Sequence, residues 1–184
     1  ACAAAQIYIE ADNALYIAKG STIPNATAFV NAVFNQVAVL YNNEGIVITI
    51  STTKIWDTVD PYAGVASNTS DMLTAFSNQV GNTFTGNLAH LFSTRDLGGG
   101  RAGLDVLCNK GKGVNGNMDN YTPNVPTFSW NVMVVAHEMG HNFGSPHTQS
   151  CSWPIGALDN CVAAEGGCPA GPAPVNGGTI MSYC

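Results

Sequence analysis

Apolar residues follow two different periods along this chain, and each period predicts a kind of element. Helical spacing in residues 24–42 and 70–83 predicts two amphipathic helices. Their apolar stripes consist of Phe29, Val33, Val37 and Leu40 in the first helix and of Met72, Phe76 and Val80 in the second. Four shorter apolar runs predict strands, the second of them buried: residues 6–11, 46–51, 88–93 and 104–107.

The order of these elements, in which strands alternate with helices, predicts an α/β fold. Such a fold pairs its strands into a mostly parallel sheet and packs helices against it. The chain has 184 residues, enough for a sizeable core, and no repeat or linker divides it, so we expect a single domain over residues 1–184. Gly98, Gly99 and Gly100 predict a turn or bulge and not a phosphate loop, because no lysine follows at the required place.

A third helix is predicted after Pro126. Ser129 or Thr127 can cap its first turn. The run from Trp130 to Ala136 is apolar nearly all round, which is typical of a helix through the middle of a domain. Polar residues follow on this helix, and burying them without partners would cost several kcal/mol. A bound metal would supply such a partner.

The end of this predicted helix carries residues whose spacing fits a metal site. His137 and His141 are four residues apart, which places both imidazoles on one helix face. Gly144 can adopt the left-handed conformation that ends the helix, so that the chain brings His147 back as a third ligand. Glu138 follows the first ligand directly, and its carboxylate can lie beside the metal without binding it.

Three protein ligands leave a fourth position for water, which distinguishes catalytic zinc sites from closed structural ones. Zinc lowers the pKa of bound water to about 7, and Glu138 can take its proton as a general base. Two alternatives remain: a closed structural zinc site with Cys151 as fourth ligand, and a helix whose histidines bind no metal. His90 stands apart from this pattern in an apolar strand, and we expect it to be structural.

The stretch from His137 to His147 matches the signature HExxHxxGxxH and resembles the metzincin metalloproteases. Residues 179–183 are similar to the methionine turn of these enzymes, with Met181 as the buried methionine. Among the metzincins, the reprolysins (adamalysin-like) resemble this chain most, through residues 8–16, 29–41, 46–50, 54–56 and 136–144. The resemblance implies a zinc-dependent endopeptidase with a twisted, mostly parallel sheet, an antiparallel edge strand, long helices and a disulfide-stapled loop before the methionine turn.

The same resemblance implies how a substrate binds. Residues 104–107 would border the cleft as the edge strand, to which an extended protein or peptide adds by backbone hydrogen bonds. Tyr183 is similar to the tyrosine with which astacins and serralysins bind zinc reversibly and stabilise the oxyanion. The alternative is a tyrosine that only packs under the site. Two competing functions are a protease fold that has lost catalysis and serves as a binding module, and a zinc hydrolase of a non-peptide bond.

Two positions depart from the reprolysin pattern. Thr148 stands where an aspartate usually follows the third histidine, which predicts a weaker tether on the ligand loop. Asp96 is similar to one residue of the reprolysin calcium site, but Gln6 stands in place of its glutamate. Calcium is therefore a second cofactor candidate that only half of the site supports.

Composition narrows the partners and the compartment. Charged residues make up 10% of the chain and the net charge is −6, without a basic patch, which argues against a nucleic-acid partner. No apolar run approaches the length that crosses a bilayer, so we expect no membrane partner, and we expect a monomer. Six cysteines fit disulfides in an oxidising compartment, which predicts a secreted protein.

The cysteines allow fifteen pairings. Cys151, Cys161 and Cys168 lack the C-x₂-C spacing of zinc knuckles. The resemblance implies that Cys108 joins a C-terminal cysteine and that the other three form local bridges. Cys2 is a candidate latency thiol for the zinc.

The ends of the chain and its sequons carry further expectations. No signal peptide is visible, so we expect a mature form whose signal and pro-segment have been removed. Reprolysins continue beyond the methionine turn, so we expect part of the substrate pocket to be missing after Cys184. Sequons at Asn25, Asn68 and Asn120 permit glycosylation in a eukaryotic source.

Overall fold

The computed structural model describes residues 4–119 and 128–184, and their elements alternate along the chain as predicted. The expectations for Cys2, Asn120, Pro126 and Thr127 lie outside the described residues. In chain order the elements are β1 (Ala5–Ala11), α1 (Asn13–Ala18), α2 (Ile23–Asn43), β2 (Ile48–Ile55), α3 (Thr69–Val80), β3 (Leu88–Phe92), β4 (Gly100–Ala102), the 3₁₀ turn η1 (Leu107–Asn109), β5 (Gly111–Asn115) and α4 (Trp130–Asn142).

The strands form one five-stranded sheet in the order β2-β1-β3-β5-β4. The first four are parallel, and β4 pairs antiparallel with β5 at the edge. The predicted α/β class, with a mostly parallel sheet and an antiparallel edge strand, is therefore confirmed. Strand β2 lies at the other edge with only Ile48 buried, so the prediction of a buried second strand is wrong.

The antiparallel edge strand lies at Gly100–Ala102 and not at 104–107 as predicted. Residues 104–107 cannot continue the strand, because Asp105 has a positive φ of 54°. The backbone N–H groups of Asp105 and Val106 instead donate to the carbonyl oxygens of His141 and Asn142 at the end of α4. This segment therefore fixes the end of the helix that carries the candidate metal ligands.

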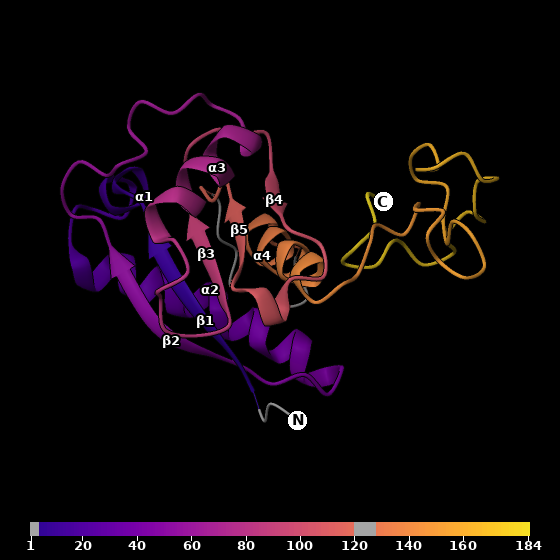
Figure 1. The fold of residues 1–184 in the computed structure, drawn as a ribbon, viewed down its shortest axis with the longest axis horizontal. Coiled ribbons are helices and arrows are strands. Elements are labelled where there is room, and N and C mark those ends of the chain that lie inside the picture. Colours follow the sequence, from indigo (N-terminus) through magenta and orange to yellow (C-terminus); the bar gives the residue numbers. More distant parts are fainter. Residues whose placement is uncertain (1–3, 120–127) are drawn as a thin grey trace.

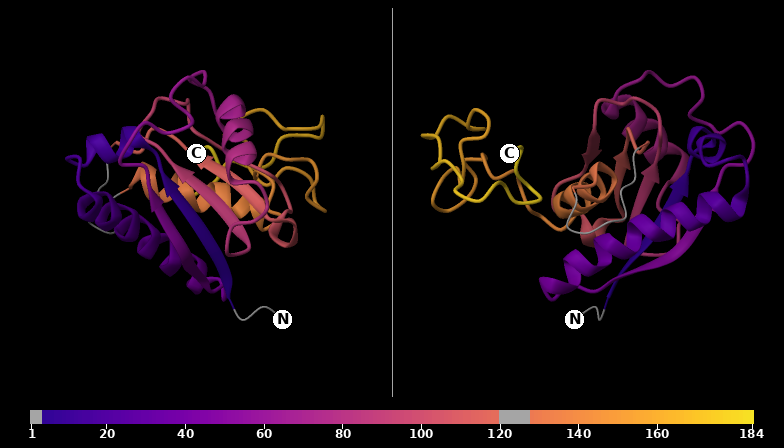
Figure 2. Two further views of the ribbon diagram at one scale, coloured as in Figure 1. Left: turned by 60° about the vertical axis from the view of Figure 1, so that its left-hand side comes forward. Right: turned by 180° about the vertical axis from the view of Figure 1, so that it is seen from behind.

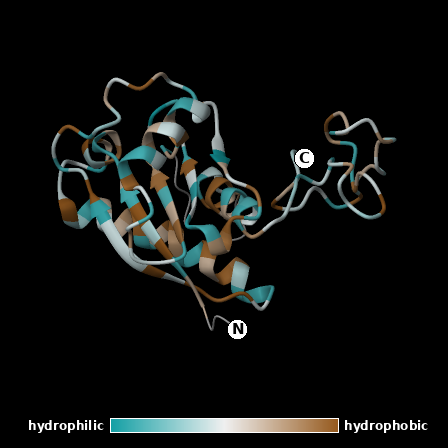
Figure 3. Ribbon diagram, viewed as in Figure 1, coloured by the Kyte–Doolittle hydropathy of each residue, from teal (hydrophilic) through white to brown (hydrophobic). Residues whose placement is uncertain are grey.

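Helices cover both faces of the sheet (Figures 1 and 2). Helices α2 and α4 pack on one face, where Ile7 and Ile9 of β1 enter the larger core cluster. Helix α3 packs on the other face, where Met72 and Phe76 meet Leu91 of β3. Hydrophobic residues accordingly line the inner faces of the helices and the strands between them (Figure 3). Of the predicted stripe residues, Leu40 is exposed and Val80 is only partly buried.

Helix α2 is, among the described residues, the one helix long and apolar enough to cross a membrane by length and composition. The expectation that no apolar run approaches the length that crosses a bilayer is therefore wrong. The N-cap residue of this helix is Thr22, whose hydroxyl accepts a hydrogen bond from the N–H of Asn25. Its buried face, which includes Val30, Val33 and Val37, belongs to the core cluster shared with the sheet and α4. These contacts are those of a helix that packs one face against a sheet.

Residues 143–184 contain no helix or strand and extend to one side of the sheet and helices (Figure 1). Within this segment the backbones of Ser150 and Glu165 form an isolated parallel β-bridge. Two disulfides staple the segment, Cys151–Cys168 and Cys161–Cys184. The predicted stapled loop is therefore confirmed, but the pairing of Cys108 with a C-terminal cysteine is wrong, because Cys184 is bonded to Cys161 and Cys108 is free and exposed.

Candidate metal centre and catalytic site

Helix α4 lies deep in the molecule, and hydrogen bonds hold it along its length. The Trp130 indole and the Asn131 amide donate to the carbonyl oxygens of Gly116 and Met118. The Tyr41 hydroxyl donates to the carbonyl oxygen of Ala136 over 2.7 Å. Ser129 is the N-cap residue as predicted, although its side chain makes no capping hydrogen bond. Any side chain on this helix is thus held on a fixed support.

The helix ends where the sequence predicts. Gly144 has a φ of +100°, and its N–H donates to the carbonyl oxygen of His141. The N–H of Ser145 donates to the carbonyl oxygen of Gly140, which closes the last turn. The chain then reverses direction and brings His147 beside the two helical histidines, with 4.7 Å between the ring centroids of His141 and His147.

The three predicted ligands present the same ring nitrogen to a common point. Each Nδ1 faces an acceptor: the Ile180 carbonyl oxygen for His137 at 2.7 Å, the Ser145 carbonyl oxygen for His141 at 2.8 Å and a Glu165 carboxylate oxygen for His147 at 2.8 Å. Because these oxygens only accept, Nδ1 carries the proton on each ring, and Nε2 has a free lone pair. The Nε2 atoms of His141 and His147 lie 3.1 Å apart.

These observations fit a divalent cation. Two nitrogen lone pairs that face each other repel unless a proton or a cation lies between them. Metal ligands require neutral imidazole, and burial lowers the pKa of His137 to about 4 and also lowers the pKa of His141. The three histidines form the one all-histidine group among the described residues whose potential ligand atoms all lie within 4.8 Å of one another.

Glu138 lies beside the histidines in a buried position, 4% exposed. One of its oxygens, Oε2, has no hydrogen-bond partner within the described part of the chain. Burial raises the pKa of this carboxyl to about 8, and Arg101 opposes the shift. The carboxylate packs against the bare α-carbon of Gly100 on β4, since a side chain there would meet Glu138 Oε1 at 2.5 Å. An unpaired carboxylate held beside a metal site is suited to accept a proton.

The predicted methionine turn lies under the same site. Met181 is partly rather than fully buried, and its sulfur occupies the space above Gly140 that a side chain at position 140 would need. The Tyr183 hydroxyl lies 2.8 Å from His147 Nε2, and its ring stacks on His137 with 5.8 Å between centroids. Tyr183 is thus placed at the converging nitrogens, although 55% of it remains exposed.

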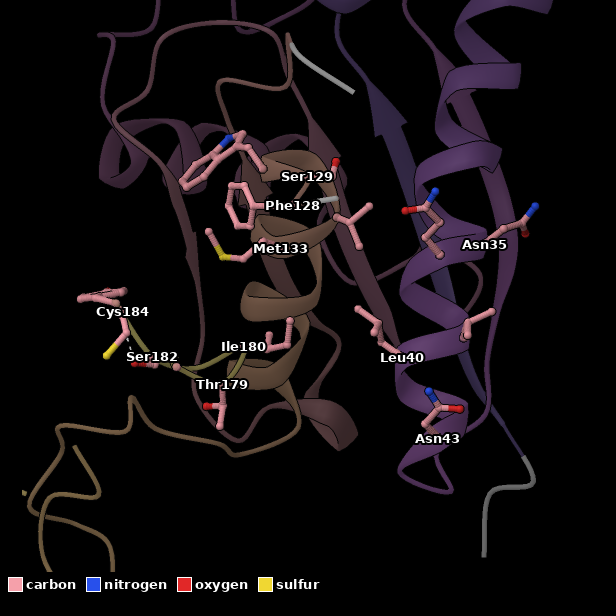
Figure 4. A pocket seen from close by; sticks show the side chains of 16 residues that line it. Asn35, Leu40, Asn43, Phe128, Ser129, Met133, Thr179, Ile180, Ser182 and Cys184 are labelled. Carbon is pink, nitrogen blue, oxygen red and sulfur yellow. Dashed lines mark hydrogen bonds between the residues drawn. The ribbon is translucent and has the colours of Figure 1, made fainter. Parts of the chain in front are cut away.

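An apolar cavity of about 960 Å³ adjoins this turn (Figure 4). One side is formed by Leu40 and Asn43 of α2, and the other by Phe128 and Met133 at α4. Residues 178–180 and 182–184 of the methionine-turn region complete the wall. The cavity therefore opens next to Tyr183 and can hold an apolar side chain.

Two groups in the loop were missed by sequence reasoning. Glu165 accepts a hydrogen bond from His147. Asp159 accepts hydrogen bonds from the hydroxyls of Thr148 and Ser182, and so joins the ligand loop to the methionine turn. The expectation that Thr148 weakens the tether stays a prediction, although Asp159 supplies a carboxylate to Thr148 from eleven residues further along the chain. No local periodicity in the loop could have indicated either residue.

The structure decides two other expectations. Cys151 is bonded to Cys168 and cannot be the fourth ligand of a closed zinc site. Gln6 lies at the start of β1, whereas Asp96 follows the far end of the neighbouring parallel strand β3, so the two do not meet in a calcium site.

His90 is structural, as predicted. It is fully buried, and its ring nitrogens lie 3.0 Å from Asn142 Oδ1 and 3.2 Å from Asn115 Nδ2. Burial lowers its pKa to about 4.

An α/β fold in which three imidazoles converge beside an unpaired buried carboxylate defines a metallopeptidase-type site. A reprolysin family model, described as metallo-peptidase family M12, matches residues 3–184. The chain belongs to this family, which confirms the resemblance inferred from its motif.

Two solved structures are similar to this chain at low sequence identity. A chain in a structure of a chaperone–substrate complex has a TM-score of 0.58 and 12% identity, over 82% of this chain and 25% of that chain. The crystal structure of metalloproteinase-II from Bacteroides fragilis has a TM-score of 0.47 and 18% identity, over 79% of this chain and 43% of that chain. This chain thus spans about a quarter of the first of these chains and less than half of the second. The likeness to the first chain shows the fold alone.

Proposed function

We propose that this chain is a secreted zinc-dependent endopeptidase. The observation that carries the proposal is the convergence of three Nε2 lone pairs beside the unpaired carboxylate of Glu138. His137, His141 and His147 would hold the ion. A zinc ion in such a site acts as a Lewis acid that polarises a carbonyl and activates water. The two disulfides support an extracellular location.

Glu138 is the proposed general base. Its buried, unpaired Oε2 can take a proton from water at the metal site, and it can pass the proton to the leaving amine as the peptide bond breaks. The Tyr183 hydroxyl can donate a hydrogen bond to the oxyanion that forms on the substrate carbonyl. The contact of this hydroxyl with His147 Nε2 supports the role.

The substrate is proposed to bind as an extended strand. Strand β4 is the edge of the sheet next to Glu138, and its outer backbone groups can pair with a peptide. Gly100 keeps the strand close to the catalytic carboxylate. The apolar cavity beside Tyr183 can accept a side chain of the same peptide.

The direct test is cleavage of casein by the purified chain, before and after removal of the metal by a chelator. We expect activity that the chelator abolishes and that one equivalent of zinc restores. Zinc binding without cleavage would favour the binding-module alternative. A panel of ester and amide substrates identifies the other alternative, a hydrolase of a non-peptide bond, if one of them is hydrolysed while casein remains intact.

A further inference from the structure

The third histidine differs from the other two in what holds it. His137 and His141 lie on a helix, and their Nδ1 atoms face backbone carbonyl oxygens. His147 lies on an irregular loop, and its Nδ1 faces a carboxylate, that of Glu165. Glu165 stands eighteen residues further along the chain, in the stapled segment.

Most exposed ion pairs contribute little, because both side chains are free to move. Glu165 is 48% exposed, but its position is fixed in three ways. Its N–H donates to the carbonyl oxygen of Gln149 over 2.9 Å, and its own carbonyl oxygen accepts from the N–H of Cys151 over 2.8 Å. Its carboxylate also accepts from the side-chain amide of the fully buried Gln149 over 3.0 Å. The Cys151–Cys168 disulfide links the same two segments that these backbone hydrogen bonds connect.

From this geometry we infer that Glu165 is a positioning residue for His147, presented by the Cys151–Cys168 disulfide. A carboxylate on Nδ1 fixes the orientation of the ring and makes Nε2 a stronger metal ligand. On a loop without helix or strand, this contact replaces the rigid support that α4 gives the other two histidines. The inference rests on the proposed zinc-dependent function and adds a residue that controls zinc affinity.

The test is the zinc dissociation constant of the purified chain, measured by competition with a chromophoric chelator. Glu165→Ala is expected to weaken zinc binding about 10- to 100-fold. Glu165→Gln retains an acceptor for Nδ1 but not the charge, and a smaller loss is expected. The control is Glu44→Ala, which removes an exposed glutamate at the end of α2 and should leave the affinity unchanged. At saturating zinc, Glu165→Ala should recover most of its kcat with an unchanged KM.

The outcomes separate this inference from the proposed function. A wild-type chain that binds no zinc contradicts the proposed function itself. A wild-type chain that binds zinc and cleaves casein, together with a Glu165→Ala variant of unchanged zinc affinity, overturns the role of Glu165 alone. A variant that is less stable to heat but binds zinc as wild type would show a merely structural role and overturn it equally.

A double-mutant cycle tests the role of the disulfide. If the staple acts through Glu165, Cys151→Ser with Cys168→Ser should weaken zinc binding in the wild-type background but not further in the Glu165→Ala background. Losses that add in full would show that the staple acts independently of Glu165 and would overturn that part of the inference. Circular dichroism of each variant should show that its total helix content is unchanged.

Discussion

Two parts of this molecule contribute to the candidate metal site, and each part is stabilised by different interactions. Residues 5–119 and 128–142 form a sheet and helices whose backbone groups pair with one another and whose core is apolar. Residues 143–184 have no helix or strand and depend on two disulfides and on side-chain hydrogen bonds to Asp159 and Glu165. The first part supplies His137, His141 and Glu138, and the second supplies His147 and Tyr183.

The difference indicates a division of tasks. The proposed base and two of the proposed ligands lie on α4, where burial and hydrogen bonds fix them. The third proposed ligand and Tyr183 lie on a segment that disulfides and side-chain hydrogen bonds hold in place. The following predictions test this division, from the largest expected effect on free energy to the smallest.

Removing the base on the rigid helix should have the largest effect. Glu138→Ala is expected to lower kcat by roughly 10²–10⁴-fold, because the variant lacks the buried carboxylate that is proposed to take the proton. Zinc content should remain one ion per chain, since the three histidines are retained. Peptide cleavage and metal analysis of the same sample measure both. Cleavage at near wild-type rate would show that the base is another group.

The stability of the rigid part should depend on pH through His90. The pKa of His90 is about 4 in the folded chain and 6.5 in a model peptide, so between pH 6.5 and pH 4 the unfolded chain binds the proton more readily than the folded chain. Stability is therefore lost as the pH falls from 6.5 toward 4, by about 3 kcal/mol at 1.36 kcal/mol per pH unit. Urea unfolding between pH 4 and pH 7 measures the loss.

The matched variant is His90→Gln, whose amide can still pair with Asn142 and Asn115 but does not titrate in this range. Its curve of stability against pH should be flatter than that of wild type by the same amount, although its stability at pH 7 can be lower. Parallel curves for the two proteins would mean that His90 is not the titrating group.

On the irregular segment, Tyr183→Phe should lower kcat by about 10- to 100-fold and leave KM almost unchanged. The loss is smaller than for Glu138, because the tyrosine is partly exposed and one of several groups that stabilise the oxyanion. Steady-state kinetics on a defined peptide separate the two constants. Equal activity of the two proteins would reduce Tyr183 to a packing residue.

The smallest effect tests the packing of the irregular segment alone. A side chain on Gly171 would meet the backbone of Ala157, Leu158 and Asp159 at 2.5–2.7 Å. Gly171→Ala should therefore destabilise the segment by about 1–2 kcal/mol and speed its cleavage by an added protease. The control is Gly64→Ala, where the added carbon meets nothing within 4 Å. If both variants resist the protease equally, the segment is not packed as described.

The sequence predicted what depends on local spacing. The offsets between His137, Glu138, His141, Gly144 and His147 follow from helix geometry and from one helix end, so the convergence of the three histidines beside Glu138 could be predicted from the chain alone. The stripes of α2 and α3 were predicted for the same reason. The apolar run of residues 88–93 was also sufficient to predict strand β3, whose five residues are all buried.

What could not be predicted depends on pairing across long separations. Strand β5, Gly111–Asn115, has no apolar alternation, and its place between β3 and β4 follows from backbone hydrogen bonds alone. Six cysteines allow fifteen complete pairings, and the sequence alone could not single out the bridges Cys151–Cys168 and Cys161–Cys184. Glu165 and Asp159 lie in a stretch without periodicity, and only the folded loop brings them to His147 and Thr148.

The chain between α4 and the third histidine of the candidate metal site is short. Only Phe143 to Pro146 separate the end of α4 from His147, and the Ser145 carbonyl is held by His141. So short a connection gives the third imidazole an effective concentration in the millimolar range about the other two. An ion held by His137 and His141 would therefore meet its third ligand, His147, in an intramolecular step.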